Sequence, residues 1–324
     1  MAESAAIILA AGKSTRMKSD LPKVLHEVCG RPMLSFVLNA CRLAGADRLL
    51  VVIGHGREQV RESFQDADDL TWVEQNEQRG TGHAVLCCRN ALKGFSGHVL
   101  VVAGDMPLVR RETISNLLES REQSGDSLML ATTILDDPTG YGRIVRDAES
   151  RIVAIVEHRD CSEEQLRIHE VNPSYYCFDA AWMWKALEKV QPAESKGEHY
   201  VTDTVRILRE MSRPVSAIAC VPAEDATGIN SRLDLAAVGR LMQDRIQLGL
   251  MNDGVTIVDP DNTWIDAEAS VGKDTILYPF TYIGTGARIG AGCRIGPFAR
   301  VPAEEAIPDS SVFGPNALCG AGTP

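Results

Sequence analysis

The chain has 324 residues, 44% of them hydrophobic, and a formal net charge of −11, which allows two globular domains and argues against a general binder of nucleic acid or anionic membranes. Its nine cysteines show no CxxC pair and no zinc-ligand spacing, and no signal-peptide pattern precedes them, so we expect reduced thiols and a cytoplasmic location. No apolar stretch approaches the roughly 20 residues that a membrane-spanning helix needs.

The first two-thirds of the chain alternate apolar, β-rich runs with amphipathic stretches. The predicted strands and the helices between them are Ala5–Ala10, Met33–Leu43, Leu49–Ile53, His83–Leu92, Val99–Ala103, Thr113–Ser120 and Leu128–Ile134. This alternation predicts a Rossmann-like α/β domain, with βαβ units and a mostly parallel sheet covered on both faces. Ligands of such sheets bind beyond the carboxyl ends of the strands, so we expect the chemistry in the loops after Ala10 and Ala103.

The loop after the first predicted strand reads LAAGKSTRMKSDLPKVLH, residues 9–26. Small residues at positions 10–12 let a ligand approach backbone N–H groups, and Arg16 and Lys23 can neutralise phosphate oxygens. Neither GxxxxGK[ST] nor GxGxxG is satisfied, which argues against a P-loop and a dinucleotide site. In so acidic a protein, a phosphate site must be a local basic pocket. The alternative is an ordinary surface loop with two solvated cations.

The stretch QNEQRGTGHAV, residues 75–85, follows a strand-like LTWVE. Gln75 can pair with the edge of a base, and Gly80 and Thr81 precede a helix, where small residues suit the close approach of a ligand. Capping of that helix by Thr81 is the structural alternative. We expect His83 to be structural rather than a general base.

The sequence GDMPL, residues 104–108, ends the apolar strand HVLVVA. Asp105 therefore lies at the ligand edge of the predicted sheet. A carboxylate there suits Mg²⁺, which takes oxygen ligands and often bridges carboxylates to substrate phosphates. Alternatively, Asp105 caps a turn before Pro107.

The remainder of the chain changes pattern twice. Two shorter strand patterns, GRIVRD and RIVAIVE, lie within residues 141–157 and predict an edge β element over the pocket. Residues 231–251 have helical apolar spacing and read as a connecting helix. After residue 252, aliphatic residues recur every six positions, mostly followed by glycine; they are Val271, Leu277, Ile283, Ile289 and Ile295. The repeat continues more weakly through Val301, Ile307 and Phe313 toward the terminal LCGAGTP. This period is the signature of a parallel β-helix, with a merely Gly-rich loop as the alternative.

These motifs become specific in combination. The chain contains, in order, LAAGKSTRM…LPKVLHEVCGRPML, QNEQRGTGHAV, VVAGDMPL, DPTGYGRIVRD, IVEHRDC, GEHYVTD and GINSR. In this order and approximate spacing, essentially residues 4–300 resemble the bacterial N-acetylglucosamine-1-phosphate uridyltransferases. Full-length members are bifunctional, because a long left-handed β-helix also acetylates glucosamine-1-phosphate with acetyl-CoA.

The resemblance implies an enzyme that transfers uridylyl from UTP to N-acetylglucosamine-1-phosphate with Mg²⁺, a step toward peptidoglycan. It implies a nucleotidyltransferase domain at 1–230, a linker helix at 231–251 and a truncated left-handed parallel β-helix at 252–324. The implied catalytic, phosphate-binding residues are Arg16 and Lys23. The implied nucleotide site comprises Leu9, Ala10, Ala11, Gly12, Gln75, Gly80, Thr81 and Gly104. The implied sugar site comprises Gly142, Glu157, Asn172 and Asn230, and Asp105 with Asn230 would hold the metal.

One departure bears on the sugar. The family usually has Asn-Thr-Gly where this chain reads Asn172-Pro173-Ser174, and a proline removes a backbone N–H and fixes φ. We therefore expect a reshaped sugar cradle. A nucleotidyltransferase for another sugar or base, and an inactive scaffold that assembles with a separate acetyltransferase, stay open as alternatives.

The C-terminal repeats carry two further expectations. The chain diverges from the family after IGPFAR, and the later His-containing acetyl-transfer segment and Asn-Tyr-Asp-Gly stretch are missing from it. We therefore expect no acetyltransferase activity. Similar β-helices associate as trimers, and a short solenoid needs its open end covered. We therefore expect a homotrimer through the β-helix, with a capped monomer as the alternative.

Overall fold

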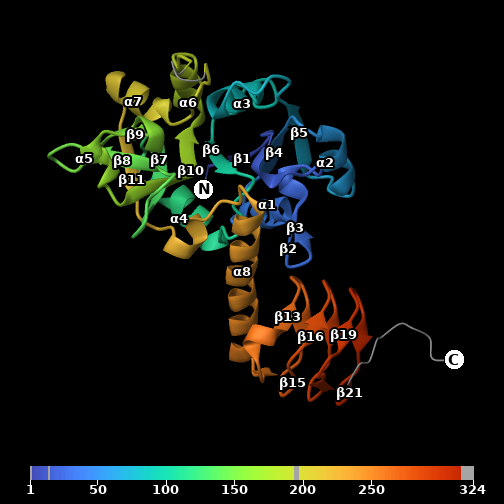
Figure 1. Ribbon diagram of the computed structural model, residues 1–324. Helices are drawn as coiled ribbons and strands as arrows, with labels where there is room; N and C mark the ends of the chain where they lie inside the picture. The colour runs from blue at the N-terminus through green and yellow to red at the C-terminus, as the bar shows by residue number, and fades with distance from the viewer. Residues whose placement is uncertain (1, 14, 193–196, 315–324) are drawn as a thin grey trace. The chain divides into compact units, whose positions relative to one another are not determined.

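The computed structural model describes residues 2–13, 15–192 and 197–314, which form two compact units (Figure 1). The first unit groups residues 1–25 with 33–231, and the second groups 26–32 with 232–324. The resemblance implies a domain at 1–230, a linker helix at 231–251 and a β-helix at 252–324; in the structure the linker helix and the short segment 26–32 are grouped with the β-helix. No helix among the described residues is long and apolar enough to cross a membrane.

The described part of the first unit is built on a nine-stranded sheet with the order β11-β7-β10-β6-β1-β4-β5, and β8 and β9 extend it from β10. Strands β1, β4, β5 and β6 are parallel, as is the β7–β11 pair, while β10 runs antiparallel to both β6 and β7. The predicted mostly parallel sheet is confirmed. The strands are β1 Ser4–Ala10, β4 Arg48–Ile53, β5 Leu70–Glu74, β6 His98–Ala103, β7 Leu128–Ile134, β8 Gly142–Arg146, β9 Ile152–Val156, β10 Glu170–Asp179 and β11 Val215–Ile218.

Helices cover both faces of this sheet. Helices α1 and α4 lie on one face, and α3, α6 and α7 lie on the other (Figure 1). The α-helices of this unit are α1 Met33–Leu43, α2 Arg57–Ser63, α3 Thr81–Cys87, α4 Arg111–Ser124, α5 Glu163–Leu166, α6 Ala180–Leu187 and α7 Asp203–Glu210, and its 3₁₀ turns are η1 Thr15–Met17, η2 Lys23–Leu25, η3 His158–Asp160 and η4 Ala223–Ala226. Helix α3 ends at Cys87 rather than at the predicted Leu92, because residues 88–94 form successive turns and Gly94 has a positive φ.

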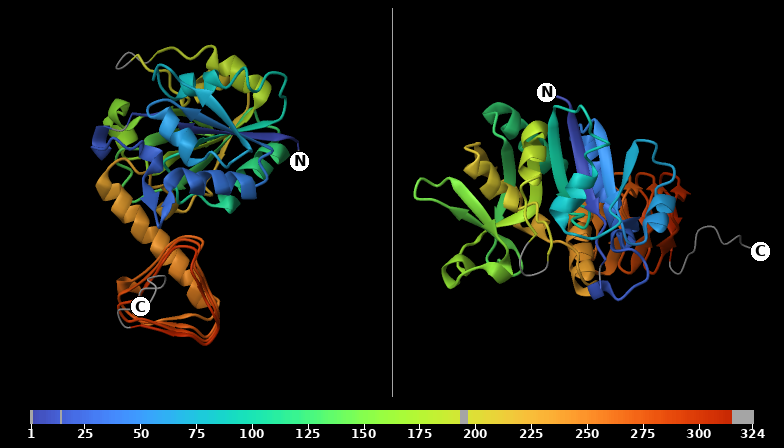
Figure 2. Two further views of the ribbon diagram at one scale, coloured as in Figure 1. Left: turned by 90° about the vertical axis from the view of Figure 1, so that its right-hand side faces the viewer. Right: turned by 90° about the horizontal axis from the view of Figure 1, so that it is seen from above.

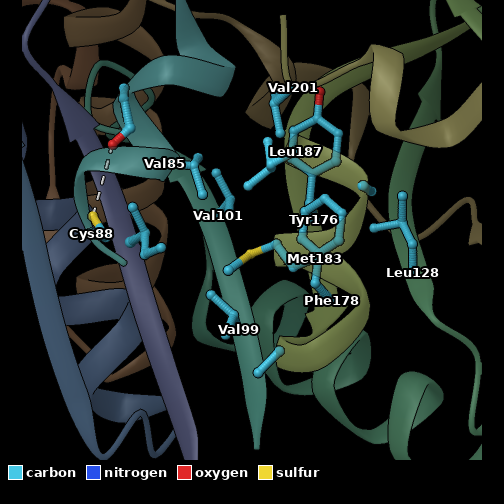
Figure 3. Packing of buried hydrophobic residues seen from close by; sticks show 14 of the residues in the cluster. Val85, Cys88, Val99, Val101, Leu128, Tyr176, Phe178, Met183, Leu187 and Val201 are labelled. Carbon is cyan, nitrogen blue, oxygen red and sulfur yellow. Dashed lines mark hydrogen bonds between the residues drawn. The ribbon is translucent and has the colours of Figure 1, made fainter. Parts of the chain in front are cut away.

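The core follows from the two-residue period of the strands. Val99 and Val101 of β6 point to the same face as Tyr176 and Phe178 of β10, and all four are buried against α6 (Figure 3). Burying each such side chain contributes roughly 1.5–3 kcal/mol to stability. The intervening residues of β6, such as Leu100 and Val102, are equally buried toward the other helix layer. The sheet is therefore a rigid platform for the loops at its edge.

Two of these loops begin side by side. Strands β1 and β6 are neighbours, and Leu9 pairs with Ala103 at their carboxyl ends. The chain continues from β1 to β4 on the side away from β6, and from β6 to β7 on the side away from β1. The two connections therefore diverge at this point of the sheet. A divergence of this kind opens a crevice that binds ligands. The loops after Ala10 and Ala103 thus meet at one edge, as predicted.

The second unit is a parallel β-helix preceded by helix α8, Arg232–Asn252. Seen end on, its coils form a triangle (Figure 2). From residue 263 onward, residues 18 apart pair in three parallel ladders, as Leu277 pairs with Ile295, so three six-residue repeats make one turn. The first pairing, of β12 with β15, joins residues 20 apart. The ladders are β12 Thr256–Ile257, β15 Ile276–Leu277, β18 Arg294–Ile295 and β21 Val312–Phe313; β13 Thr263–Ile265, β16 Thr281–Ile283 and β19 Arg300–Val301; and β14 Ser270–Val271, β17 Arg288–Ile289 and β20 Ala306–Ile307.

The repeat residues fill the interior of this coil. The aliphatic residues predicted from the six-residue register, from Val271 to Ile307, are buried, and Phe313 packs against them. Helix α8 carries two buried amides: Gln243 bonds the backbone of Ile265 through both amide atoms, and Gln247 donates to Thr263 O at 2.8 Å. The hairpin of β2 Glu27–Val28 and β3 Arg31–Pro32 and the turn η5 Pro260–Asn262 complete the unit. The terminal LCGAGTP lies outside the described residues.

Candidate functional site

A cavity of roughly 650 Å³ lies at the carboxyl ends of β1 and β6, within the first unit. This volume suits a small-molecule ligand. Twelve of the residues named from the sequence line it: Leu9, Ala10, Ala11, Gly12, Arg16, Lys23, Gln75, Gly80, Thr81, Asp105, Glu157 and Asn230. Gly104, Gly142 and Asn172 were named with them but are not among its lining residues.

Four polar side chains converge at one end of this cavity. The Lys23 ammonium donates to the Asp105 carboxylate and, at 3.1 Å, to Asn230 Oδ1. Arg16 Nη2 donates to the same Asn230 oxygen at 2.9 Å. Residues 16, 23, 105 and 230 are far apart in sequence, so this cluster is a product of the fold.

The backbone explains how these side chains meet. Lys23 opens the 3₁₀ turn η2, which follows Pro22 and is anchored by the buried side chains of Val24 and Leu25. Asp105 lies two residues beyond the end of β6, and its carbonyl accepts the backbone N–H of Ile229 at 3.0 Å. That bond brings the loop that carries Asn230 beside Asp105.

The Asp105 carboxylate and the Asn230 amide oxygen have the chemistry of a cation site. Asp105 and Asn230 both direct a side-chain oxygen at a positive group, the Lys23 ammonium. A carboxylate and an amide oxygen are hard ligands of the kind that Mg²⁺ takes, and Mg²⁺ usually completes its shell with waters and substrate phosphates. The described residues hold no group of three or more His, Cys, Asp or Glu that could cage a metal alone. The donor set therefore fits a cation that is shared with a phosphate ligand.

The opening loop leaves space for such a ligand. A Cβ placed on Gly12 would meet no protein atom within 4 Å, and Gly12 lines the cavity. Gly80 is different, because its φ is +95° and a Cβ there would lie 2.5 Å from the His199 carbonyl oxygen. Gly12 is thus free to accept a side chain sterically, whereas Gly80 is required by the fold.

A second wall of the cavity is formed where residues 79–82 pair with residues 199–201. The backbone N–H of Gly82 donates to His199 O at 2.7 Å, and His199 N–H donates to Arg79 O at 2.7 Å. Thr81 Oγ1 accepts the Val201 N–H at 3.0 Å and makes no capping hydrogen bond to helix α3. The alternative in which Thr81 caps the helix is wrong, because the N-cap of α3 is Gly80 and the Thr81 hydroxyl instead bonds the backbone of residue 201.

Another part of the cavity wall carries a carboxylate, Glu157. Glu157 follows β9, and Thr202 Oγ1 donates to its Oε1 at 3.4 Å. Burial raises the pKa of Glu157 above its ordinary value, and the Thr202 hydroxyl partly offsets that rise. Asn172 is buried behind this wall, where its amide Nδ2 donates to the Tyr176 hydroxyl at 2.6 Å. Tyr176 itself lines the cavity.

The architecture matches a known protein family. Residues 6–201 match the MobA-like NTP transferase domain, a span of more than half of the chain. The chain belongs to this family. Residues 268–303 also match the bacterial transferase hexapeptide repeat, in the part of the second unit that forms the parallel β-helix.

Curated relatives support the narrower resemblance. The chain is 44% identical over 274 residues to the "Bifunctional protein GlmU" of Clostridium acetobutylicum, which covers 85% of this chain and 60% of that protein. It is 42% identical over 289 residues to the protein of the same name from Geotalea daltonii, covering 89% and 63% respectively. The resemblance to the bifunctional uridyltransferases is confirmed. The chain spans about 60% of the length of these relatives.

A solved structure shares the fold. The crystal structure of UDP-glucose pyrophosphorylase complexed with UDP-glucose aligns with a TM-score of 0.62 at 16% identity, and it covers 75% of this chain and 99% of that one. At this level of identity the likeness concerns the fold, and it agrees with the α/β nucleotidyltransferase architecture.

Sequence reasoning missed several residues that line the cavity of this NTP transferase domain. They are Lys13, Val24, Gln78, Ala84, Ala103, Arg159, Ser174, Tyr176, Glu198, Tyr200, Val201 and Thr202. The motif GEHYVTD signalled the resemblance and contains Tyr200 and Thr202. Their place in the wall depends on the long-range pairing of residues 79–82 with 199–201, which local sequence does not specify.

Replacing Glu157 by glutamine should stabilise the protein near neutral pH. Because burial raises the pKa of Glu157, the free-energy cost of its charge appears as the pH rises through that pKa. We expect Glu157→Gln to unfold about 2 °C above wild type at pH 7.5, as roughly 0.5–1 kcal/mol would give for a domain of this size. Thermal melts should show the difference vanish below the ordinary carboxyl pKa of 4.5. A glutamine variant less stable at pH 7.5 would contradict this reading.

Proposed function

We propose that this chain transfers uridylyl from UTP to N-acetylglucosamine-1-phosphate and releases pyrophosphate. One observation carries the proposal: Arg16, Lys23, Asp105 and Asn230 meet at one end of a cavity that Glu157 borders elsewhere. Phosphates would lie at the cationic end, and sugar hydroxyls would lie near the carboxylate. The family and its bifunctional relatives support the reaction class.

The reaction needs few chemical steps from the protein. An oxygen of the sugar-1-phosphate attacks the α-phosphorus of UTP, a new P–O bond forms, and the bond to the β-phosphate oxygen breaks, so that pyrophosphate leaves with the electron pair. A phosphate monoester is a competent nucleophile at neutral pH. Arg16 and Lys23 would neutralise phosphate oxygens and hold the two reactants in line, which supplies most of the rate enhancement.

Asp105 and Asn230 would hold Mg²⁺ in this proposal. The bound cation would act as a Lewis acid toward phosphate oxygens. The role of Asp105 and Asn230 would be to offer the cation two fixed oxygens at the edge of the sheet. Lys23 bridges the same two oxygens in the structure, so we propose that its ammonium moves toward the phosphates when substrate binds.

A pyrophosphate-release assay tests the function. We expect release with UTP and N-acetylglucosamine-1-phosphate in the presence of Mg²⁺, and strong reduction when the metal is chelated. Each of the other three common nucleoside triphosphates, and each of several other sugar-1-phosphates, should be a poorer substrate. Absence of turnover with every pair would contradict the proposal and favour an inactive scaffold.

Gly12 offers a sharper test of the nucleotide position. Because nothing in the protein lies within 4 Å of a Cβ at this residue, Gly12→Ala should keep its melting temperature while the KM for UTP rises about tenfold or more. Gly80→Ala is the matched comparison, since its clash with the His199 backbone and its positive φ should lower the melting temperature. An unchanged KM in Gly12→Ala would move the triphosphate away from this loop.

A second candidate function is transfer to another sugar-1-phosphate. It is favoured by Ser174, which lines the cavity with a φ of +67° beside a register shift in β10. The backbone N–H of Ser174 donates to Asn172 Oδ1 at 3.1 Å, which ties up the amide oxygen of a residue predicted to bind the sugar. The scan over sugar-1-phosphates decides between the two acceptors.

Two further proposals concern the hexapeptide region: its activity and its oligomeric state. We propose that the 324-residue chain lacks acetyltransferase activity, and incubation with acetyl-CoA and glucosamine-1-phosphate should release no CoA above background. We also propose a homotrimer formed through the β-helix. Light scattering should give three times the chain mass of 35.2 kDa, and the monomer mass would contradict the trimer.

A further inference from the structure

Gln75 presents a side-chain amide whose orientation the structure fixes. It follows β5, is buried, and lines the cavity. Its Nε2 atom lies 3.1 Å from the Gly80 carbonyl oxygen and 3.0 Å from His83 Nδ1. A carbonyl oxygen can only accept a hydrogen bond, so the amide atom that faces Gly80 must be nitrogen rather than oxygen.

That assignment determines the state of His83. Because Gln75 Nε2 is a donor, His83 Nδ1 must be the acceptor, and a neutral ring then carries its proton on Nε2. Burial lowers the pKa of His83, and the positive charges of Arg79 and His199 lower it further, while Glu77 acts in the opposite sense. The neutral form of the imidazole therefore persists to lower pH than for an ordinary histidine.

The consequence concerns what Gln75 can offer to a ligand. Both hydrogens of Nε2 are directed at protein acceptors, and Gln78 Nε2 donates to the Gln75 backbone carbonyl rather than to the side chain. Oε1 is therefore left to serve the cavity, with no donor hydrogen-bonded to it in the described part of the chain. A lone acceptor suits a base edge that carries an N–H, as uracil does at N3. Cytosine carries an unprotonated nitrogen at that position and repels the same oxygen.

We propose that His83 is a positioning residue that sets base selectivity by holding the Gln75 amide with its oxygen toward the nucleotide. This inference rests on the proposed function, because it assigns the recognition of uracil within that site. When His83 takes up a second proton, both ring nitrogens become donors and Nδ1 can no longer accept from Gln75. Affinity for UTP should therefore fall as the pH drops below the ordinary histidine range.

The first test compares base selectivity in His83→Leu and His83→Asn. Leucine removes the acceptor, and we expect the ratio of kcat/KM for UTP over CTP to fall about tenfold. Asparagine can place a carbonyl oxygen near the position of Nδ1 without titrating, so it should keep more of the ratio and lose the rise in KM for UTP at low pH. An active leucine variant with an unchanged ratio would overturn the proposal.

A second test does not depend on turnover or on the leucine variant folding. Long-range ¹H–¹⁵N spectra of the wild-type chain at pH 7 should show His83 with Nε2 protonated and Nδ1 unprotonated. A proton on Nδ1 would overturn the inference even in an active enzyme. If instead wild type uses no UTP but shows the expected tautomer, then the proposed function has failed and the orientation of Gln75 still holds.

Discussion

Asp105→Asn is expected to lower the turnover of uridylyl transfer by about a hundredfold or more. The substitution keeps the size of the side chain but removes the negative charge at the carboxyl end of β6, where Lys23 and Asn230 converge. A preorganised electrostatic contact of this kind is worth about two to three powers of ten in rate. Steady-state pyrophosphate release at saturating substrates measures the effect.

A binding readout separates loss of the cation from loss of folding. Ligands that bind the folded state raise its melting temperature, and the increase grows with the ratio of ligand concentration to Kd. UTP with Mg²⁺ should raise the melting temperature of wild type, and Asp105→Asn should lose most of the increment that Mg²⁺ adds to UTP alone. Asp68→Asn, an exposed change in a loop away from the cavity, is the control and should behave as wild type. Turnover of Asp105→Asn within a few-fold of wild type would contradict the role of this carboxylate.

Lys23→Ala is expected to have an effect of similar size for a different reason. The ammonium bonds both Asp105 and Asn230. Its removal takes away a positive charge that would contact the triphosphate, and Arg16 cannot supply that charge from its own position. We expect turnover to fall about a hundredfold, equivalent to about 2.7 kcal/mol of transition-state stabilisation. The KM for UTP should change less than kcat, because the charge matters most as negative charge shifts onto the leaving pyrophosphate.

Matched variants show whether charge or packing is responsible. Lys18→Ala alters a lysine of the same loop that does not line the cavity, and it should keep turnover within about twofold of wild type. Lys23→Arg retains the charge but replaces a compact ammonium by a planar fork, so it should recover only part of the rate. Equal losses in Lys18→Ala and Lys23→Ala would instead point to disruption of the whole loop.

Much of the fold could be predicted from the sequence because its signals are local. The alternation of β-rich runs with helical periodicity predicts the parallel strands, and the predicted helix Met33–Leu43 has the bounds of α1. The six-residue register predicts the interior of the β-helix, where each aliphatic residue meets the one 18 positions later. Such periodicities are encoded in neighbouring residues and need no knowledge of distant partners.

Strand β10 shows why other parts could not be predicted. It is the longest strand of the sheet, yet Pro173 lies within it, and a proline normally argues against a central strand. The structure accommodates Pro173 at a register shift between Val171 and Tyr175, which only the partner strand reveals. The antiparallel insertion of β10 between β6 and β7 is a long-range property that no local pattern expresses.

The candidate site divides in the same way. Residues on loops that directly follow a strand, such as Asp105 and Gln75, could be named because the carboxyl edge of a parallel sheet is a general location for ligands. Tyr200 and Thr202 could not, because their place in the cavity depends on how residues 199–201 pair with 79–82. The role of His83 in orienting Gln75 likewise follows only from atomic distances.

The central claim is that phosphates are held between the loop of Arg16 and Lys23 and the oxygens of Asp105 and Asn230. A crystal structure of the chain with UTP, Mg²⁺ and a non-reactive analogue of the sugar phosphate tests it most directly. We expect the triphosphate against Lys23, the cation between Asp105 and Asn230, and the uracil N3–H on Gln75 Oε1. A nucleotide bound outside this cavity, or one inside it with its phosphates turned toward Glu157, would contradict the account.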